Sequence, residues 1–151
     1  MSVAPRQTEQ SSEPPVPQPP RQYAVERFVD IVWRAVGSAE DPNTLELLAI
    51  LGGTSRSPLK TLCKTLGIAP RDARDFARLF RVFVITSGDT NDFHNLLQIA
   101  EPHTMRKFFA RAGLDYPAML SPLEFLERQR LVRNEQVVKA LKSLVEKQLV
   151  T

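Results

Sequence analysis

Arg71, Arg74 and Arg78 follow one another at intervals of three and four residues, the spacing that places side chains on one side of a helix. A guanidinium group binds phosphate or reads the edge of guanine, and both uses require an exposed side chain. The chemistry that this pattern predicts is recognition of nucleic acid. The candidate binding residues are Arg56, Lys60, Lys64, Arg71, Arg74, Asp75 and Arg78.

Positive charge is concentrated around these residues. The range from Arg56 to Arg81 holds seven basic and two acidic residues, a net charge of +5, whereas the formal net charge of the whole chain is +3. A local basic stripe of this kind is typical of a surface that binds nucleic acid. The alternative is a packing role, because Asp72 and Asp75 would repel phosphates and Arg71 can pair with Asp75 on a solvated helix face.

The residues that usually carry catalysis or bind metals are sparse. His94 and His103 are nine residues apart and Cys63 is the single cysteine, so no metal-ligand cluster of recognised spacing is present. The sequence has no nucleophile elbow, no Walker-type phosphate loop and no dinucleotide glycine fingerprint. Cys63 falls on an apolar helical stripe, which predicts a small core residue. We therefore expect no enzymatic activity, no metal and no cofactor.

The arginines must be positioned by two helices and the turn between them. Ser57 and Pro58 indicate the start of the first helix, Gly67 ends it, and Pro70 opens the second. Over about 25 residues this arrangement resembles a helix-turn-helix unit, whose second helix enters the major groove. The positions expected to hold the two helices together are Cys63, Ile68, Ala73 and Phe76.

The remaining sequence predicts a compact all-α domain of about eight short helices over residues 22–151, preceded by a disordered proline-rich arm over residues 1–21. The arm holds six of the twelve prolines, and such a composition does not repay the entropy of folding. It would serve as a linker or dock on an SH3-like or WW-like groove. The further helices are expected to begin near Tyr23, Thr44, Asp92, Pro102, Pro122 and Asn134.

Two segments allow alternative interpretations. Arg81 to Thr86 has the β-branched and aromatic composition of a strand, but it can also be the end of the second helix. The helix from Asn134 to Leu149 carries an apolar stripe that either folds back onto the core or pairs with a second chain as a homo-oligomer. The second possibility supports another hypothesis, a helical assembly subunit that binds protein through this helix and the proline-rich arm.

The compartment is predicted from what the sequence lacks. A single cysteine excludes an internal disulfide, no apolar run approaches the length of a membrane span, and the N-terminus has no secretory pattern. We expect a cytoplasmic or nuclear protein with no membrane partner. The first functional hypothesis is a small regulator, for example of transcription, that binds duplex DNA.

Overall fold

The computed structural model describes residues 21–87 and 92–150, which form eight α-helices and no strand. The all-α prediction is confirmed. The predicted arm falls almost entirely outside the described residues, and so do residues 88–91. The helices are α1 (Arg21–Val36), α2 (Leu45–Leu51), α3 (Arg56–Leu66), α4 (Pro70–Thr86), α5 (Phe93–Leu97), α6 (Pro102–Arg111), α7 (Pro122–Arg128) and α8 (Glu135–Val150).

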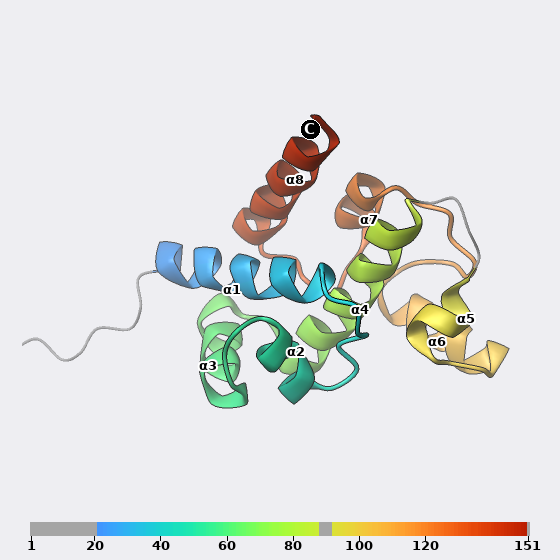
Figure 1. The fold of residues 1–151 in the computed structure, drawn as a ribbon, viewed down its shortest axis with the longest axis horizontal. Helices are drawn as coiled ribbons and strands as arrows, with labels where there is room; N and C mark the ends of the chain where they lie inside the picture. Colours follow the sequence, from blue (N-terminus) through green and yellow to red (C-terminus); the bar gives the residue numbers. More distant parts are fainter. Residues whose placement is uncertain (1–20, 88–91, 151) are drawn as a thin grey trace, which may run out of the picture.

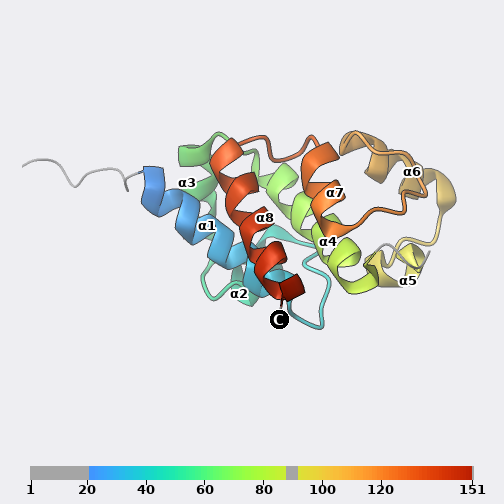
Figure 2. The same cartoon turned by 90° about the horizontal axis from the view of Figure 1, so that it is seen from above.

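Helix α4 is the centre of the molecule. It crosses between α1, α2 and α3 at one end of the long axis and α5 and α6 at the other (Figure 1). Helices α7 and α8 lie beside each other on a third side, where α7 contacts α4 and α8 contacts α1 (Figures 1 and 2). Because α4 packs against other helices on several sides, most of its surface is inside the fold.

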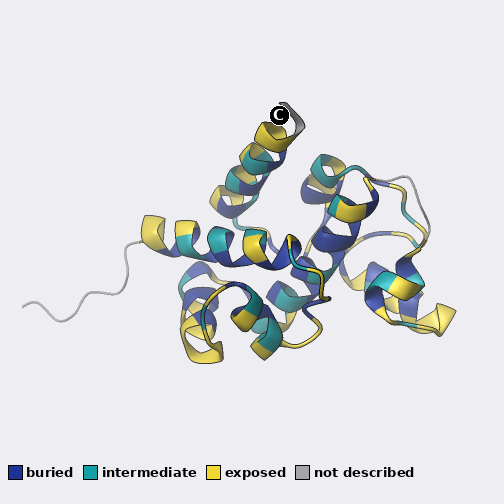
Figure 3. Cartoon of the chain, in the orientation of Figure 1, coloured by how far each residue is buried: buried dark blue, intermediate teal, exposed yellow. Residues whose placement is uncertain are grey.

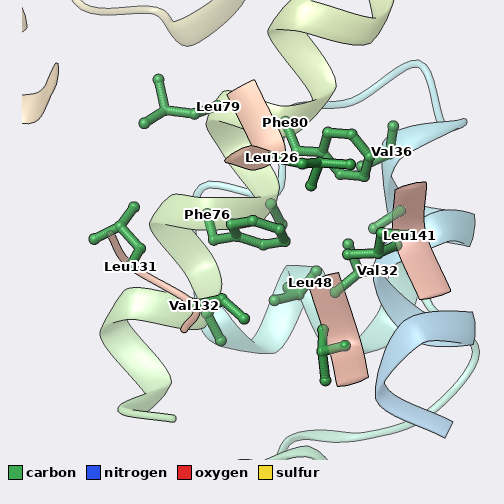
Figure 4. Close-up of a cluster of buried hydrophobic side chains, with 14 of the residues drawn as sticks. Val32, Val36, Leu48, Phe76, Leu79, Phe80, Leu126, Leu131, Val132 and Leu141 are labelled. Carbon is green, nitrogen blue, oxygen red and sulfur yellow. The ribbon is translucent and has the colours of Figure 1, made fainter. Parts of the chain in front are cut away.

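Aromatic side chains of α4 form the middle of the core. Phe76, Phe80 and Phe83 are all fully buried. Their ring centroids lie 5.6, 5.9 and 5.1 Å from the ring of Phe125, which comes from α7. Figure 4 shows Phe80 beside Leu126, with aliphatic side chains of α1 and α2 completing the cluster. Phe76, Phe80 and Phe83 share one side of α4. Four further residues of the helix are also fully buried and extend the packed surface to other sides: Ala73, Ala77, Leu79 and Val82.

The segment from Arg81 to Thr86 is the last part of α4, so its interpretation as a strand is wrong. Val82, Phe83 and Thr86 are buried, and their spacing places them on one side of a helix. Burial against neighbouring helices here outweighs the β-propensity of the composition.

Helix α2 packs closely on α1. Leu48 is fully buried, and Gly52 ends the helix directly over Ile31. A Cβ at Gly52 would lie 2.3 Å from the Cγ2 atom of Ile31, so only glycine fits without movement. This contact fixes the distance between the two helices.

Two caps fix the start of the last helices. At α7 a capping box is present: the Ser121 hydroxyl accepts from the Glu124 amide at 3.1 Å, and the Glu124 carboxylate accepts from the Ser121 amide at 2.9 Å. This bond to the Ser121 amide lowers the pKa of Glu124. At α8 the Asn134 side chain accepts from the Val137 amide at 3.1 Å.

The apolar side of α8 faces the rest of the chain. Val137, Leu141 and Val145 are buried, and the helix contacts α1 and α7. The prediction that this stripe folds back onto the core is therefore confirmed. Pairing with a second chain stays an untested prediction, and three of the side chains that suggested it, Val137, Leu141 and Val145, are buried within this chain.

Candidate nucleic-acid interface

The predicted pair of helices joined by a glycine turn is present as α3, Gly67 and α4. Gly67 has φ 71°, a left-handed conformation that favours glycine, and its amide donates to Lys64 O while the Ile68 amide donates to Cys63 O at 2.9 Å. The four positions expected to hold the helices together, Cys63, Ile68, Ala73 and Phe76, are all buried.

The start of α3 differs from the prediction. The helix begins at Arg56, so Ser55 is the N-cap residue and Ser57 lies inside the first turn. The Ser55 side chain makes no capping hydrogen bond, and the Ser57 carbonyl accepts from the Thr61 hydroxyl at 3.2 Å. Pro58 still fits, because first-turn amides have no partner within the helix.

Arg78 is inside the fold, and its predicted exposure is wrong. Its side chain is 12% exposed and forms an ion pair with Asp41 at 3.0 Å. It also donates to the carbonyl of Leu97 at 2.8 Å, and its guanidinium carbon lies 4.9 Å from the centre of the Phe108 ring. Arg78 therefore joins the loop before α2 to the end of α5 and to α6, and it is not available to a groove.

Asp75 is also buried, which contradicts its predicted place on an outer face. Its carboxylate accepts from Arg74 at 2.9 Å and from Arg111 of α6. Arg111 also pairs with Asp72 at 2.7 Å. The pairing of Arg71 with Asp75, which the sequence allowed, is not formed. Arg74 is only partly exposed, so the middle of α4 does not present a row of free arginines.

Four of the predicted cations do remain free. Arg56, Lys60, Lys64 and Arg71 are exposed, and none forms an ion pair or a side-chain hydrogen bond with another residue in the described part of the chain. The first three recur every four residues along α3, so they lie on one side of it. Figure 3 shows exposed turns on α3, in contrast to the largely buried α4. We call these four residues the α3 stripe.

The α3 stripe borders a shallow hollow of about 400 Å³. Of the α3 stripe, Lys60 and Lys64 line this hollow, together with Pro70 at the start of α4. Exposed cations at such a hollow can bind phosphate groups without first breaking an internal ion pair.

A second basic surface was missed by the sequence reasoning. The α7 helix, the segment after it and the start of α8 line a groove of about 1010 Å³. The only sequence signal was the short run Arg128, Arg130 and Arg133, which falls across a helix end where no regular spacing marks a face. The basic residues in the groove lining are Arg128, Arg130, Arg133, Lys139 and Lys142.

The residues considered for other chemistry have structural surroundings. His94 of α5 contacts the hydroxyl of Tyr116 at 2.9 Å and the carbonyl of Ile99 at 2.6 Å, whereas His103 is exposed on α6. Cys63 is buried, and this burial raises the pKa of its thiol to about 11. Within residues 21–87 and 92–150, no three histidine, cysteine or acidic side chains are grouped to hold a metal ion.

None of the described helices is both long enough and apolar enough to cross a bilayer. Comparison of the chain with protein-family models, with curated proteins and with solved structures finds no match.

Proposed function

We propose that this protein binds duplex nucleic acid through the α3 stripe and acts as a non-enzymatic regulator. The observation that carries the proposal is the contrast between two sets of basic residues. Arg74 and Arg78 are used in internal ion pairs, whereas Arg56, Lys60, Lys64 and Arg71 are exposed without such partners. Exposed and unpaired cations on one side of a helix suit phosphate contacts.

The stripe favours contacts with the backbone over reading of base sequence. Specific reading usually needs bidentate side chains on a helix that enters the major groove. Arg78 of α4 is only 12% exposed and pairs with Asp41, and Asp75 is enclosed by Arg74 and Arg111. Only the first turn of α4, with Arg71, is left to approach a duplex. Most of the binding free energy would then come from counterion release at phosphates.

The test compares two double variants. Lys64→Ala with Arg71→Ala removes one lysine and one arginine from the α3 stripe. Arg106→Ala with Lys107→Ala removes the same two residue types from the exposed side of α6, so it is a control with the same change in net charge. Each lost phosphate contact should lower the salt slope of log affinity by about 0.9.

We call the double variant at Lys64 and Arg71 the stripe pair and the double variant at Arg106 and Lys107 the control pair. The stripe pair should bind a mixed-sequence duplex more weakly, with a salt slope of log affinity smaller by about two units. The control pair should bind like the wild type. Fluorescence anisotropy with a labelled duplex at several salt concentrations measures both. Equal binding by the two variants would remove the α3 stripe as the site. Absence of wild-type binding at low salt would favour the assembly hypothesis instead.

A further inference from the structure

The backbone that lines the groove between α7 and α8 is held in place by internal hydrogen bonds. Gln129 is buried at the end of α7, and its side-chain oxygen accepts from the amides of Leu131 and Val132, both at 2.9 Å. Its side-chain nitrogen donates to the carbonyl of Val132 at 2.6 Å. The amide of Arg130 donates to the carbonyl of Ala112 at 2.9 Å, which ties this segment to the end of α6. These bonds fix the backbone on either side of Gln129, from which the exposed side chains of Arg128 and Arg130 extend.

Most of the positive charge in this groove is not neutralised internally. Arg130, Arg133 and Lys139 are exposed and form no ion pair with another described residue. Lys142 pairs with Glu127 at 3.4 Å, and Arg128 lies 4.0 Å from Glu124 in an exposed contact. Exposed pairs of this kind contribute little and are easily exchanged for another anion. With five basic and two acidic residues, the lining has a net charge of +3.

We propose that this groove is a second phosphate-binding surface that holds the backbone of the same duplex nucleic acid as the α3 stripe. The inference rests on the proposed function and extends it. In Figure 2 the segment that joins α7 to α8 and helix α3 lie toward the same edge of the molecule, whereas Figure 1 shows α1 between α3 and α8, so the two surfaces lie apart from each other. A duplex is a rigid polyanion with one charge per about 1.7 Å of axis, so it is long enough to reach both surfaces.

The lining also indicates which part of the nucleic acid is bound. The apolar residues in the groove are the aliphatic Leu126, Val132 and Val138, and no aromatic side chain lines it. Proteins that hold single strands usually stack bases on aromatic rings. A groove lined by cations and by aliphatic residues suits phosphates and sugars, so the proposed occupant is the backbone of a duplex.

The test uses the same matched design. Arg133→Ala with Lys139→Ala removes two exposed cations of the groove, and the pair at Arg106 and Lys107 again serves as the control. In anisotropy titrations with a mixed-sequence duplex, the salt slope of the groove pair should be smaller by about two units than that of the control. Combined with the stripe pair, the loss should be about four units, because separate phosphate contacts add.

A second measurement needs no variant. Acetylation of lysines in the full chain, read by mass spectrometry, should show Lys139 and Lys64 protected by the duplex and Lys107 unchanged. A groove pair that keeps the slope of the control, with Lys139 not protected, would overturn the groove while leaving the α3 stripe intact. The reverse pattern, with Lys139 protected and Lys64 not protected, would overturn the stripe and keep the groove.

The occupant is tested with a polyanion that has no phosphate. Poly-glutamate should compete with the duplex only at much higher charge concentration, because the groove is proposed to fit the regular backbone of a duplex. Equal competition that is lost in the groove pair would assign the groove to an acidic protein and overturn the proposal of a nucleic-acid occupant.

Discussion

Asp75 is enclosed by two arginines from different parts of the chain, Arg74 beside it and Arg111 of α6. Its side chain is 2% exposed, while those of the two arginines are about one-third exposed. A buried carboxylate that loses its charge leaves both cations without their partner. Because the two arginine side chains remain partly exposed to solvent, the loss of stability should be smaller than for a fully buried ion pair.

Asp75→Asn is therefore expected to lower the free energy of unfolding by about 1–3 kcal/mol, measured by urea denaturation. Asp72→Asn is the control: Asp72 pairs with the same Arg111 but is 32% exposed, so a smaller loss is expected. If Asp72→Asn cost more than Asp75→Asn, the buried pair would not be the main link between α4 and α6.

Cys63 gives a prediction in the alkaline range. Burial raises the pKa of its thiol from 9.0 to about 11, so the unfolded chain ionises first as the pH rises. The stability that the protonated thiol contributes is fully present below pH 9 and is lost between pH 9 and pH 11, by on the order of 2–3 kcal/mol. Urea denaturation of the wild type should therefore show a steeper loss over this range than Cys63→Ala. Parallel loss in the two proteins would show that the thiol does not ionise differently on folding.

At the scale of elements, the sequence was sufficient to predict the helix pair around Gly67 and the positions that hold the two helices together. Helical spacing and a glycine with positive φ are local features, so they can be read from a short stretch. The partners of Arg78 and Asp75 could not be read in this way. Asp41 is 37 residues from Arg78, and Arg111 is 36 residues from Asp75. Periodicity shows that one side of α4 is polar, but it does not show that other helices cover that side.

The groove beside α7 was missed for a related reason. Arg130 and Arg133 lie in an irregular segment whose course is set by the buried side chain of Gln129. Lys139 belongs to the next helix. A helical repeat in the sequence relates residues only within one helix. The basic residues of the groove come from two elements, so only the folded arrangement shows that they line the same groove.

Helix α2 offers a direct test of how the small elements are anchored. Leu48 is fully buried between helices, whereas Ile50 on the same helix is 56% exposed. Leu48→Ala should lower the free energy of unfolding by about 2–5 kcal/mol, because contacts are lost and a cavity remains. Ile50→Ala, measured in the same urea titration, should change it by less than about 1 kcal/mol. Similar losses for both variants would mean that α2 does not pack on this side.

At the scale of the whole molecule, the distribution of charge matters more than its total. The formal net charge is only +3, yet exposed and unpaired cations gather on the α3 stripe and in the groove beside α7. Such local patches attract a polyanion over roughly one Debye length, about 8–10 Å at physiological salt. The remaining basic residues include several that stabilise the fold, as Arg78 does. In the proposed function, binding and stability thus depend on different arginines.

The most direct measurement is the dependence of wild-type affinity on salt. If the α3 stripe meets a duplex, its four cations release counterions and give a slope of log affinity against log salt of about −3 to −4, which becomes steeper if the groove also contributes. Anisotropy titrations of the full chain with a mixed-sequence duplex, from about 50 to 200 mM salt, determine this slope. A slope of that size, reduced in the stripe pair and unchanged in the Arg106 and Lys107 control, is the predicted result. A slope near zero, or no binding at the lowest salt, would contradict the account.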